Sequence, residues 1–192
     1  MMEIDFDDVT LDGDPELMNT QMIPWEDCDK HEEYANQLDR SQNFREVFTL
    51  VKKSVKDALN HERTGLLLYL RDMPLKVGAY HQLGTNGIIL NRVLLEQVIQ
   101  TTASRIEVNA FIYYILLHEY LHTLGYIDER RVRELTYVVA EETFGPTHVA
   151  TKMAVEGPWS FIKINPFYMP RSHERGIEIV REFEDPSSKY IS

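Results

Sequence analysis

The sequence is most informative at residues 117–128, which run Leu-His-Glu-Tyr-Leu-His-Thr-Leu-Gly-Tyr-Ile-Asp. Two of these residues, His118 and His122, are four apart, so on a helix their imidazoles lie on one face and can reach a single metal ion. Glu119 lies between them and faces the open side of such an ion, where a bound water molecule would sit. The stretch therefore predicts a helix that carries a metal site.

The flanking sequence predicts that this helix is long and largely buried. It begins at Ser104 or Glu107, and apolar side chains line most of its circumference. Gly125 fits the position just beyond a helix end, where the backbone takes a left-handed conformation. Asp128 then has the place of an N-cap for a following helix over residues 129–143. The motif thus ends in a turn between two helices.

A metal bound by two histidines needs a third protein ligand, and several acids compete for that role. In a tight hairpin of the two helices, His118 lies about 10 Å back from the turn, whereas Glu142 lies about 21 Å up the second helix. Glu134 has a suitable height but points away from the apolar stripe of its helix. Asp128 is close to the two histidines both in the sequence and along the helix axis, so it is the preferred ligand. It is also well placed as a plain helix cap. Glu142, Glu134 and Glu129 remain the alternatives.

The rest of the chain predicts a small sheet and further helices, and hence an α+β or mixed α/β fold. Apolar residues at three- and four-residue spacing predict helices, and short apolar runs bounded by turn residues predict strands. The expected elements are a helix at 42–60 capped by Ser41, strands at 65–70, 76–80 and 88–91, a helix at 92–101, a strand at 159–164 and a helix near 172–184.

Acidic residues are concentrated at the N-terminus. Residues 1–40 contain thirteen acids and two bases, and the remainder contains eighteen of each, so the formal net charge of −11 belongs to the first fifth of the chain. This distribution predicts an acidic N-terminal arm over residues 1–40 and a single domain over residues 41–192. The sequence has no basic stripe, so a large nucleic-acid interface is not expected.

The composition predicts a cytoplasmic globular protein. No apolar run approaches the roughly 18 residues that span a bilayer, and the acidic first residues are unlike a secretory signal. Cys28 is the only cysteine, which rules out an internal disulfide and fits a reducing compartment. We therefore expect the cytoplasm as the location and no contact with a membrane.

At the metal motif the sequence resembles the zincin metallopeptidases. The pattern His118-Glu119-x-x-His122-x-x-Gly125-x-x-Asp128 is similar to the extended motif of the metzincins, with aspartate in place of the usual third histidine, as in the snapalysin-type members. The resemblance implies a zinc ion on His118, His122 and Asp128. It also implies that Glu119 is the general base and that the substrate is a peptide or protein.

The same resemblance implies further features of the fold and of the site. A zincin-like domain has an antiparallel edge strand beside the cleft, for which we nominate Ile88–Asn91, and the active-site helix backs its sheet. Metzincins also have a methionine-containing turn beneath the metal, for which Met153 is the candidate. A donor for the oxyanion is expected as well. Its candidates are Tyr126, His148, Tyr168 and His173.

A second resemblance is to the YbeY family of metal-dependent RNA-processing proteins, and it rests on Leu121–Tyr126. That family has glycine where this chain has Glu119, and histidine where it has Asp128, so Glu119 favours the peptidase. The sequence therefore predicts a zinc-dependent metallopeptidase. An RNA-processing hydrolase and a catalytically silent, zincin-like protein that binds a partner are the alternatives.

Overall fold

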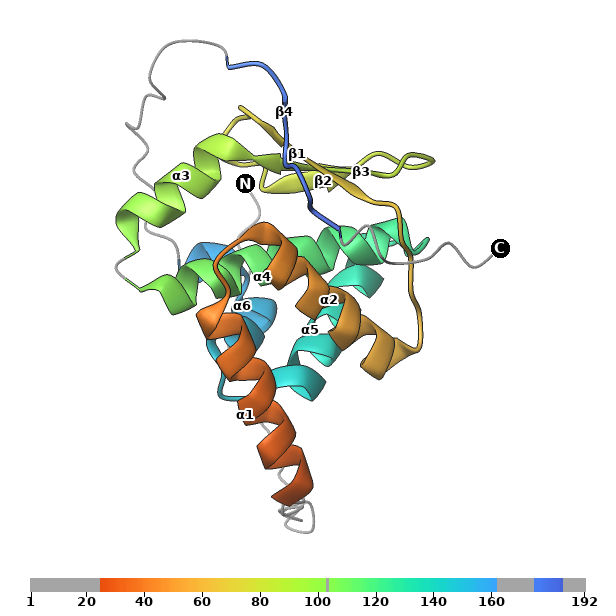
Figure 1. Ribbon diagram of the computed structural model, residues 1–192, viewed down its shortest axis with the longest axis vertical. Helices are drawn as coiled ribbons and strands as arrows, with labels where there is room; N and C mark the ends of the chain where they lie inside the picture. The colour runs from red at the N-terminus through yellow and green to blue at the C-terminus, as the bar shows by residue number, and fades with distance from the viewer. Residues whose placement is uncertain (1–24, 103, 162–174, 185–192) are drawn as a thin grey trace, which may run out of the picture.

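The computed structural model describes residues 25–102, 104–161 and 175–184. Within them, α-helices pack beneath and beside a small four-stranded sheet (Figure 1). The predicted α+β class is confirmed at this level. The elements in chain order are α1 (Trp25–Arg40), α2 (Phe44–Leu59), β1 (Leu67–Arg71), β2 (Ala79–His81), β3 (Gly87–Asn91), α3 (Arg92–Thr101), α4 (Arg105–Thr123), α5 (Glu129–Phe144), α6 (Val149–Glu156), the short 3₁₀ helix η2 (Pro158–Ser160) and β4 (Glu178–Ile179).

The sheet has the strand order β2-β3-β1-β4. β1 and β3 run parallel, whereas β2 pairs antiparallel with β3 and β4 pairs antiparallel with β1. The prediction that Ile88–Asn91 forms the edge strand is wrong, because these residues have a neighbouring strand on each side. Ile88 and Leu90 are almost completely buried, as is usual for a strand inside a covered sheet. The antiparallel edge strand beside the motif helix is the short β2.

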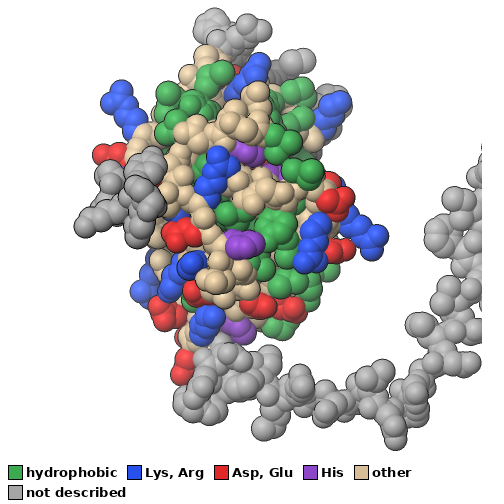
Figure 2. Space-filling view, turned by 90° about the vertical axis from the view of Figure 1, so that its right-hand side faces the viewer, with side chains coloured by type: hydrophobic (Ala, Val, Ile, Leu, Met, Phe, Trp, Pro, Cys, Tyr) green, Lys and Arg blue, Asp and Glu red, His purple; other side chains and the backbone are tan. Residues whose placement is uncertain are grey.

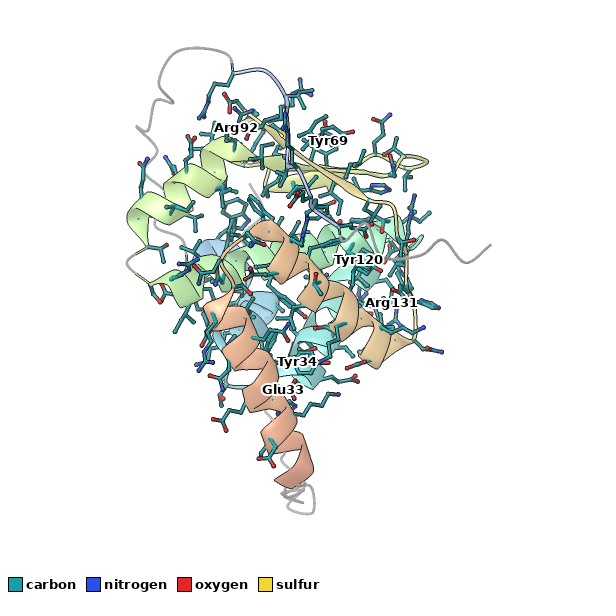
Figure 3. All side chains as sticks on the ribbon, in the orientation of Figure 1. Glu33, Tyr34, Tyr69, Arg92, Tyr120 and Arg131 are labelled. Atoms are coloured by element: carbon teal, nitrogen blue, oxygen red, sulfur yellow. The ribbon has the colours of Figure 1, made fainter. Side chains whose placement is uncertain are left out.

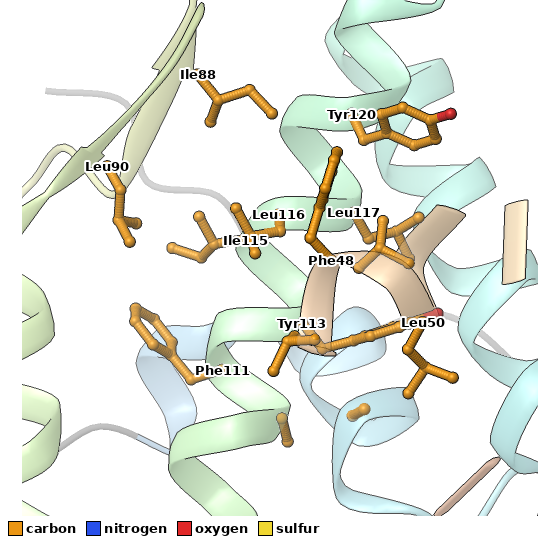
Figure 4. Close-up of a cluster of buried hydrophobic side chains, with 14 of the residues drawn as sticks. Phe48, Leu50, Ile88, Leu90, Phe111, Tyr113, Ile115, Leu116, Leu117 and Tyr120 are labelled. Atoms are coloured by element: carbon orange, nitrogen blue, oxygen red, sulfur yellow. The ribbon is translucent and has the colours of Figure 1, made fainter. Parts of the chain in front are cut away.

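α4 is the centre of the core. Ile88 and Leu90 of the sheet face Ile115 and Leu116 on one side of this helix (Figure 4). Helices α1, α2, α5 and α6 pack against its other sides. Eleven of its nineteen residues are buried, which confirms that most of the helix circumference is covered. The motif is therefore carried by a helix that its surroundings fix in place.

The helix ends follow local capping rules. α3 occupies the predicted residues 92–101, and α4 begins directly after Ser104. The cap predicted for α2 is wrong: Asn43 accepts a hydrogen bond from the backbone N–H of Glu46 (3.0 Å), while the Ser41 hydroxyl donates to a carbonyl of α1. None of the described helices combines the length and apolar character that crossing a membrane requires.

The described part of the predicted acidic arm is packed into the core. Residues 25–40 form α1, on which Figure 3 labels Tyr34. Tyr34 and Leu38 of this helix are buried. Asn109 of α4 donates hydrogen bonds to the Leu38 carbonyl (2.8 Å) and the Ser41 carbonyl (3.0 Å). Four-residue spacing places Tyr34 and Leu38 on one helix face, so residues 25–40 pack on the core as a helix, and the division at residue 40 stays a prediction. Residues 1–24 lie outside the described residues.

The C-terminal third differs most from the sequence-based expectation. α6 was not predicted, and it contains Met153, which is buried in a helix and not in a turn. Where a strand was expected at 159–164, the chain has the 3₁₀ helix η2 up to Ser160. Residues 162–164 lie outside the described residues. The helix expected near 172–184 is also wrong: residues 178–179 pair with β1, and Phe183 stacks on Phe48 of α2 with ring centroids 4.2 Å apart. Residues 172–174 are not described.

Candidate metal centre

The two motif histidines lie side by side near the C-terminal end of α4. Their ring centroids are 5.0 Å apart, and both side chains are largely buried. This end of α4, on the right in Figure 1, lies toward the face seen in Figure 2, where histidine side chains reach the surface among acidic and basic ones. The expected arrangement of His118 and His122 on one helix face is present.

The turn after α4 orients the second histidine. Gly125 has φ +97°, the left-handed conformation predicted for it, and the chain then reverses. As a result, the Tyr126 carbonyl accepts a hydrogen bond from His122 Nδ1 at 2.8 Å. A neutral imidazole that donates from Nδ1 keeps its lone pair on Nε2. His122 Nε2 is therefore available to a metal.

Glu129 completes the group, and Asp128 does not. Glu129 Oε1 lies 3.3 Å from His118 Nε2, and its Oε2 lies 3.5 Å from His122 Nε2. One ligand atom from each of these three residues lies within 4.8 Å of the others. Asp128 Oδ1 instead accepts a hydrogen bond from the backbone N–H of Arg131 (2.8 Å) and caps α5. The structure thus brings Glu129, and not the preferred Asp128, to the two histidines.

A simple directional argument explains this difference. Side chains on a helix lean toward its N-terminus, so a residue in the first turn of α5 leans back over the end of α4. An N-cap side chain bonds the N–H groups of its own helix, and this removes Asp128 from the site. The other two alternatives lie elsewhere: Glu134 pairs with arginines of α5, and Glu142 is exposed some 20 Å along that helix.

Glu119 lies next to this group and is only 6% exposed. Burial, and secondarily the charge of Glu129, raise its pKa to about 8 in the metal-free protein, while a backbone hydrogen bond with His81 lowers it. Glu119 Oε2 has no hydrogen-bond partner among the described residues. Because an unpartnered buried carboxylate oxygen is costly, this environment fits a nearby cation or a water molecule bound to one.

His118 is also prepared for a metal. Burial, together with the neighbouring charge of His122, lowers its pKa, although Glu129 opposes that shift. The imidazole is therefore favoured in the neutral form, which is the form that binds metals. Two imidazole nitrogens and one carboxylate oxygen are a ligand set that zinc accepts in catalytic sites. The residues present thus fit the ion that the sequence motif implies.

Two hollows adjoin at this group. Both are lined by Ala79, His118, Glu119 and Glu129, so they meet over the histidines. One has a volume of about 430 Å³ and extends between α5 and the end of α6, and the other has a volume of about 350 Å³ and extends past β2. Further lining residues are Tyr114, Arg133, Val155 and Trp159 in the first, and Tyr80, His81, Leu83, His122 and Ile127 in the second.

β2 presents its outer edge to these hollows. The Gly78 carbonyl accepts from Asn91 N (2.9 Å) of β3, and Tyr80 is registered opposite Ile89. Since backbone groups alternate in direction along a strand, those of Ala79 and His81 point away from β3. The hydrogen bond between His81 and Glu119 agrees with that direction. An extended chain lying in the hollows would meet the Ala79 backbone groups.

The candidates for an oxyanion donor are not gathered at the site. Tyr126 directs its hydroxyl to His61 Nδ1 (2.9 Å), and His148 caps α6 and stacks on Phe144. Tyr168 and His173 lie outside the described residues. Among the polar residues that line the hollows, sequence reasoning missed His81 and Arg133. Of these two, only Arg133 could have been predicted, because it follows Glu129 by four residues and can pair with it on a helix.

Comparison with known proteins gives no identification. No family model, curated protein or solved structure matches this chain. The function must therefore be argued from the site itself.

Proposed function

We propose that this protein is a zinc-dependent metallopeptidase. One observation carries the proposal: ligand atoms of His118, His122 and Glu129 lie within 4.8 Å of one another, with the buried Glu119 carboxylate beside them. The likeness of the motif to the zincins supports it. In this proposal the zincin-type arrangement is kept, but Glu129 replaces Asp128 as the third ligand.

Each residue has a defined task in the proposed reaction. When bound, zinc would lower the pKa of its water ligand toward about 7 and polarise the substrate carbonyl. Glu119 would accept a proton from the attacking water on its carboxylate and would later deliver it to the leaving amine. The outer edge of β2 pairs with the substrate backbone at Ala79. Peptide side chains on either side of the cleaved bond enter the two hollows.

The decisive experiment combines metal content with hydrolysis. Wild-type protein should contain one zinc per chain by elemental analysis and should cleave a mixed peptide library until a chelator is added. Glu119→Gln should keep its zinc and lose about 10²- to 10⁴-fold in rate, the usual contribution of general acid–base catalysis. Glu107→Gln, at the far end of the same helix, is the matched control and should match wild type.

Two results would overturn the proposal. A Glu119→Gln protein as active as wild type would exclude Glu119 as the base. Stoichiometric zinc without turnover on any peptide would favour the silent partner-binding protein or, if nucleotides are released from RNA, the RNA-processing hydrolase. We also propose a cytoplasmic location, because a chain with Cys28 as its only cysteine fits a reducing compartment.

A further inference from the structure

We propose that Arg133 is the positioning residue that holds Glu129 in place as a metal ligand. This inference rests on the zinc site of the proposed function and adds a residue that the motif does not contain. Arg133 Nε donates to Glu129 Oε1 at 3.1 Å. The same carboxylate faces both histidines, so the guanidinium lies directly behind the third ligand.

Apart from the two histidines, Arg133 is the described residue that pairs with the Glu129 carboxylate. The Glu129 side chain is 52% exposed, and it belongs to the first residue of α5. A glutamate in that place can rotate into solvent, and fixing it on a metal costs side-chain entropy. The hydrogen bond from Arg133 already selects the rotamer that faces the site.

The spacing on α5 makes this pair selective. Glu129 precedes Arg133 by four residues, which is the favourable order for an ion pair on a helix. The two arginines between them, Arg130 and Arg131, both pair with Glu134 instead (3.2 and 3.3 Å). The start of α5 therefore carries two separate ion-pair groups, and only one of them includes a residue of the metal centre.

The chemistry of a ligating carboxylate explains why an arginine suits this place. A carboxylate that gives one oxygen to zinc keeps a second oxygen that needs a donor. The guanidinium stays charged and offers several donors in a planar fork. Arg133 also lines the first hollow beside His118 and Tyr114, so its guanidinium belongs to the surroundings of the metal centre. Outer partners of this kind typically change metal affinity by about 10- to 100-fold.

The test measures zinc affinity and does not depend on activity. The full chain is titrated with Zn²⁺ in competition with a chromophoric chelator. Arg133→Gln should bind zinc about 10- to 100-fold more weakly than wild type. Arg130→Gln removes the same charge from the same helix without touching Glu129 and should bind as wild type does. Equal affinities for the two variants would overturn the proposal.

A double-mutant cycle checks that Arg133 acts through Glu129. In a Glu129→Gln background, Arg133→Gln should cause no further loss, because the two changes act on one contact. Equal losses with and without Glu129 would overturn the proposal. The Co²⁺-loaded Arg133→Gln protein should also show an altered ligand-field spectrum, which a merely structural change would leave alone. Thermal unfolding of the metal-free variants verifies that all of them fold.

The outcome also separates this inference from the proposed function. Wild-type protein that binds zinc but cleaves nothing would end the peptidase proposal, whereas the effect of Arg133→Gln on affinity would stand. Wild-type protein that binds no zinc would overturn both.

Discussion

Asn91 is the residue whose replacement should damage the frame of the site most. Its side chain is fully buried, and its Nδ2 donates to the carbonyls of Met73 (3.1 Å), Pro74 (3.0 Å) and Val77 (2.7 Å). Its Oδ1 accepts from the Met73 N–H and caps α3. One side chain thus fixes the loop that leads into β2, the strand beside the metal centre. Asn91→Ala should loosen that loop and lower the stability of the whole fold.

The magnitude follows from the groups that lose partners. A lost N-cap costs about 1 kcal/mol, and leaving the partly buried carbonyls of the loop without donors adds about 1–3 kcal/mol in total. The free energy of unfolding should therefore fall by about 3 kcal/mol, which at about 2–4 °C per kcal/mol lowers Tm by roughly 6–12 °C. Asn91→Asp keeps the capping oxygens but loses the donors, so it should not rescue stability.

The matched control is Asn43→Ala. Asn43 also caps a helix, but it is exposed and has no such loop to hold. It should therefore lose only the cap, about 1 kcal/mol. Thermal unfolding of the metal-free proteins, followed by circular dichroism, gives both values. If Asn91→Ala costs no more than Asn43→Ala, the loop hydrogen bonds contribute nothing and the reasoning is refuted.

Three further predictions concern the site and the fold. Glu129→Gln should weaken zinc binding by at least about 100-fold, more than an outer partner does, whereas Asp128→Asn keeps the helix cap and should bind zinc normally; calorimetric titration would contradict the ligand assignment if the two results were exchanged. Burial lowers the pKa of His148 below its usual 6.5, so the unfolded chain binds more protons just below that pH and stability should fall as pH drops from about 6.5. The free energy of unfolding, measured with urea between pH 5 and 7, should depend less on pH in His148→Asn than in wild type. An unchanged pH dependence would exclude this histidine as the cause. Phe183→Ala should cost about 3–5 kcal/mol, while Ile177→Ala, at an exposed position, should leave the calorimetric Tm unchanged; similar losses for both would show that Phe183 is not part of the core.

Local rules predicted much of the site from the sequence. The four-residue spacing of His118 and His122, the turn at Gly125 and the cap at Asp128 each depend on a few neighbouring residues, and the structure has all three. The same capping rule that located Asp128 also decides against it as a ligand, since the hydrogen bond from the Arg131 N–H holds its side chain on its own helix. Choosing Glu129 needed the direction in which first-turn side chains lean, which spacing alone does not give.

Long-range pairing decided what the sequence left open. An apolar run such as Ile88–Leu90 indicates a buried strand but not its neighbours, so the edge strand was assigned to the wrong segment. The helical spacing near residues 172–184 was overridden because β1 has a free edge that β4 pairs with. The acidic composition of residues 1–40 predicted an arm and gave no indication that Tyr34 and Leu38 are buried. Their burial depends on partners in α2 and α4.

The three candidate ligands lie within twelve consecutive residues, from His118 to Glu129. An ion bound there would close only a very short loop, so it would remove little freedom from the unfolded chain. The core around α4, in contrast, joins segments from the whole of the described chain through buried apolar side chains. We therefore expect that metal loading is not the step that folds this protein, unlike small domains that collapse only around zinc. Ion uptake and release by the intact fold can then follow the supply of metal, while the two hollows beside the histidines keep their shape.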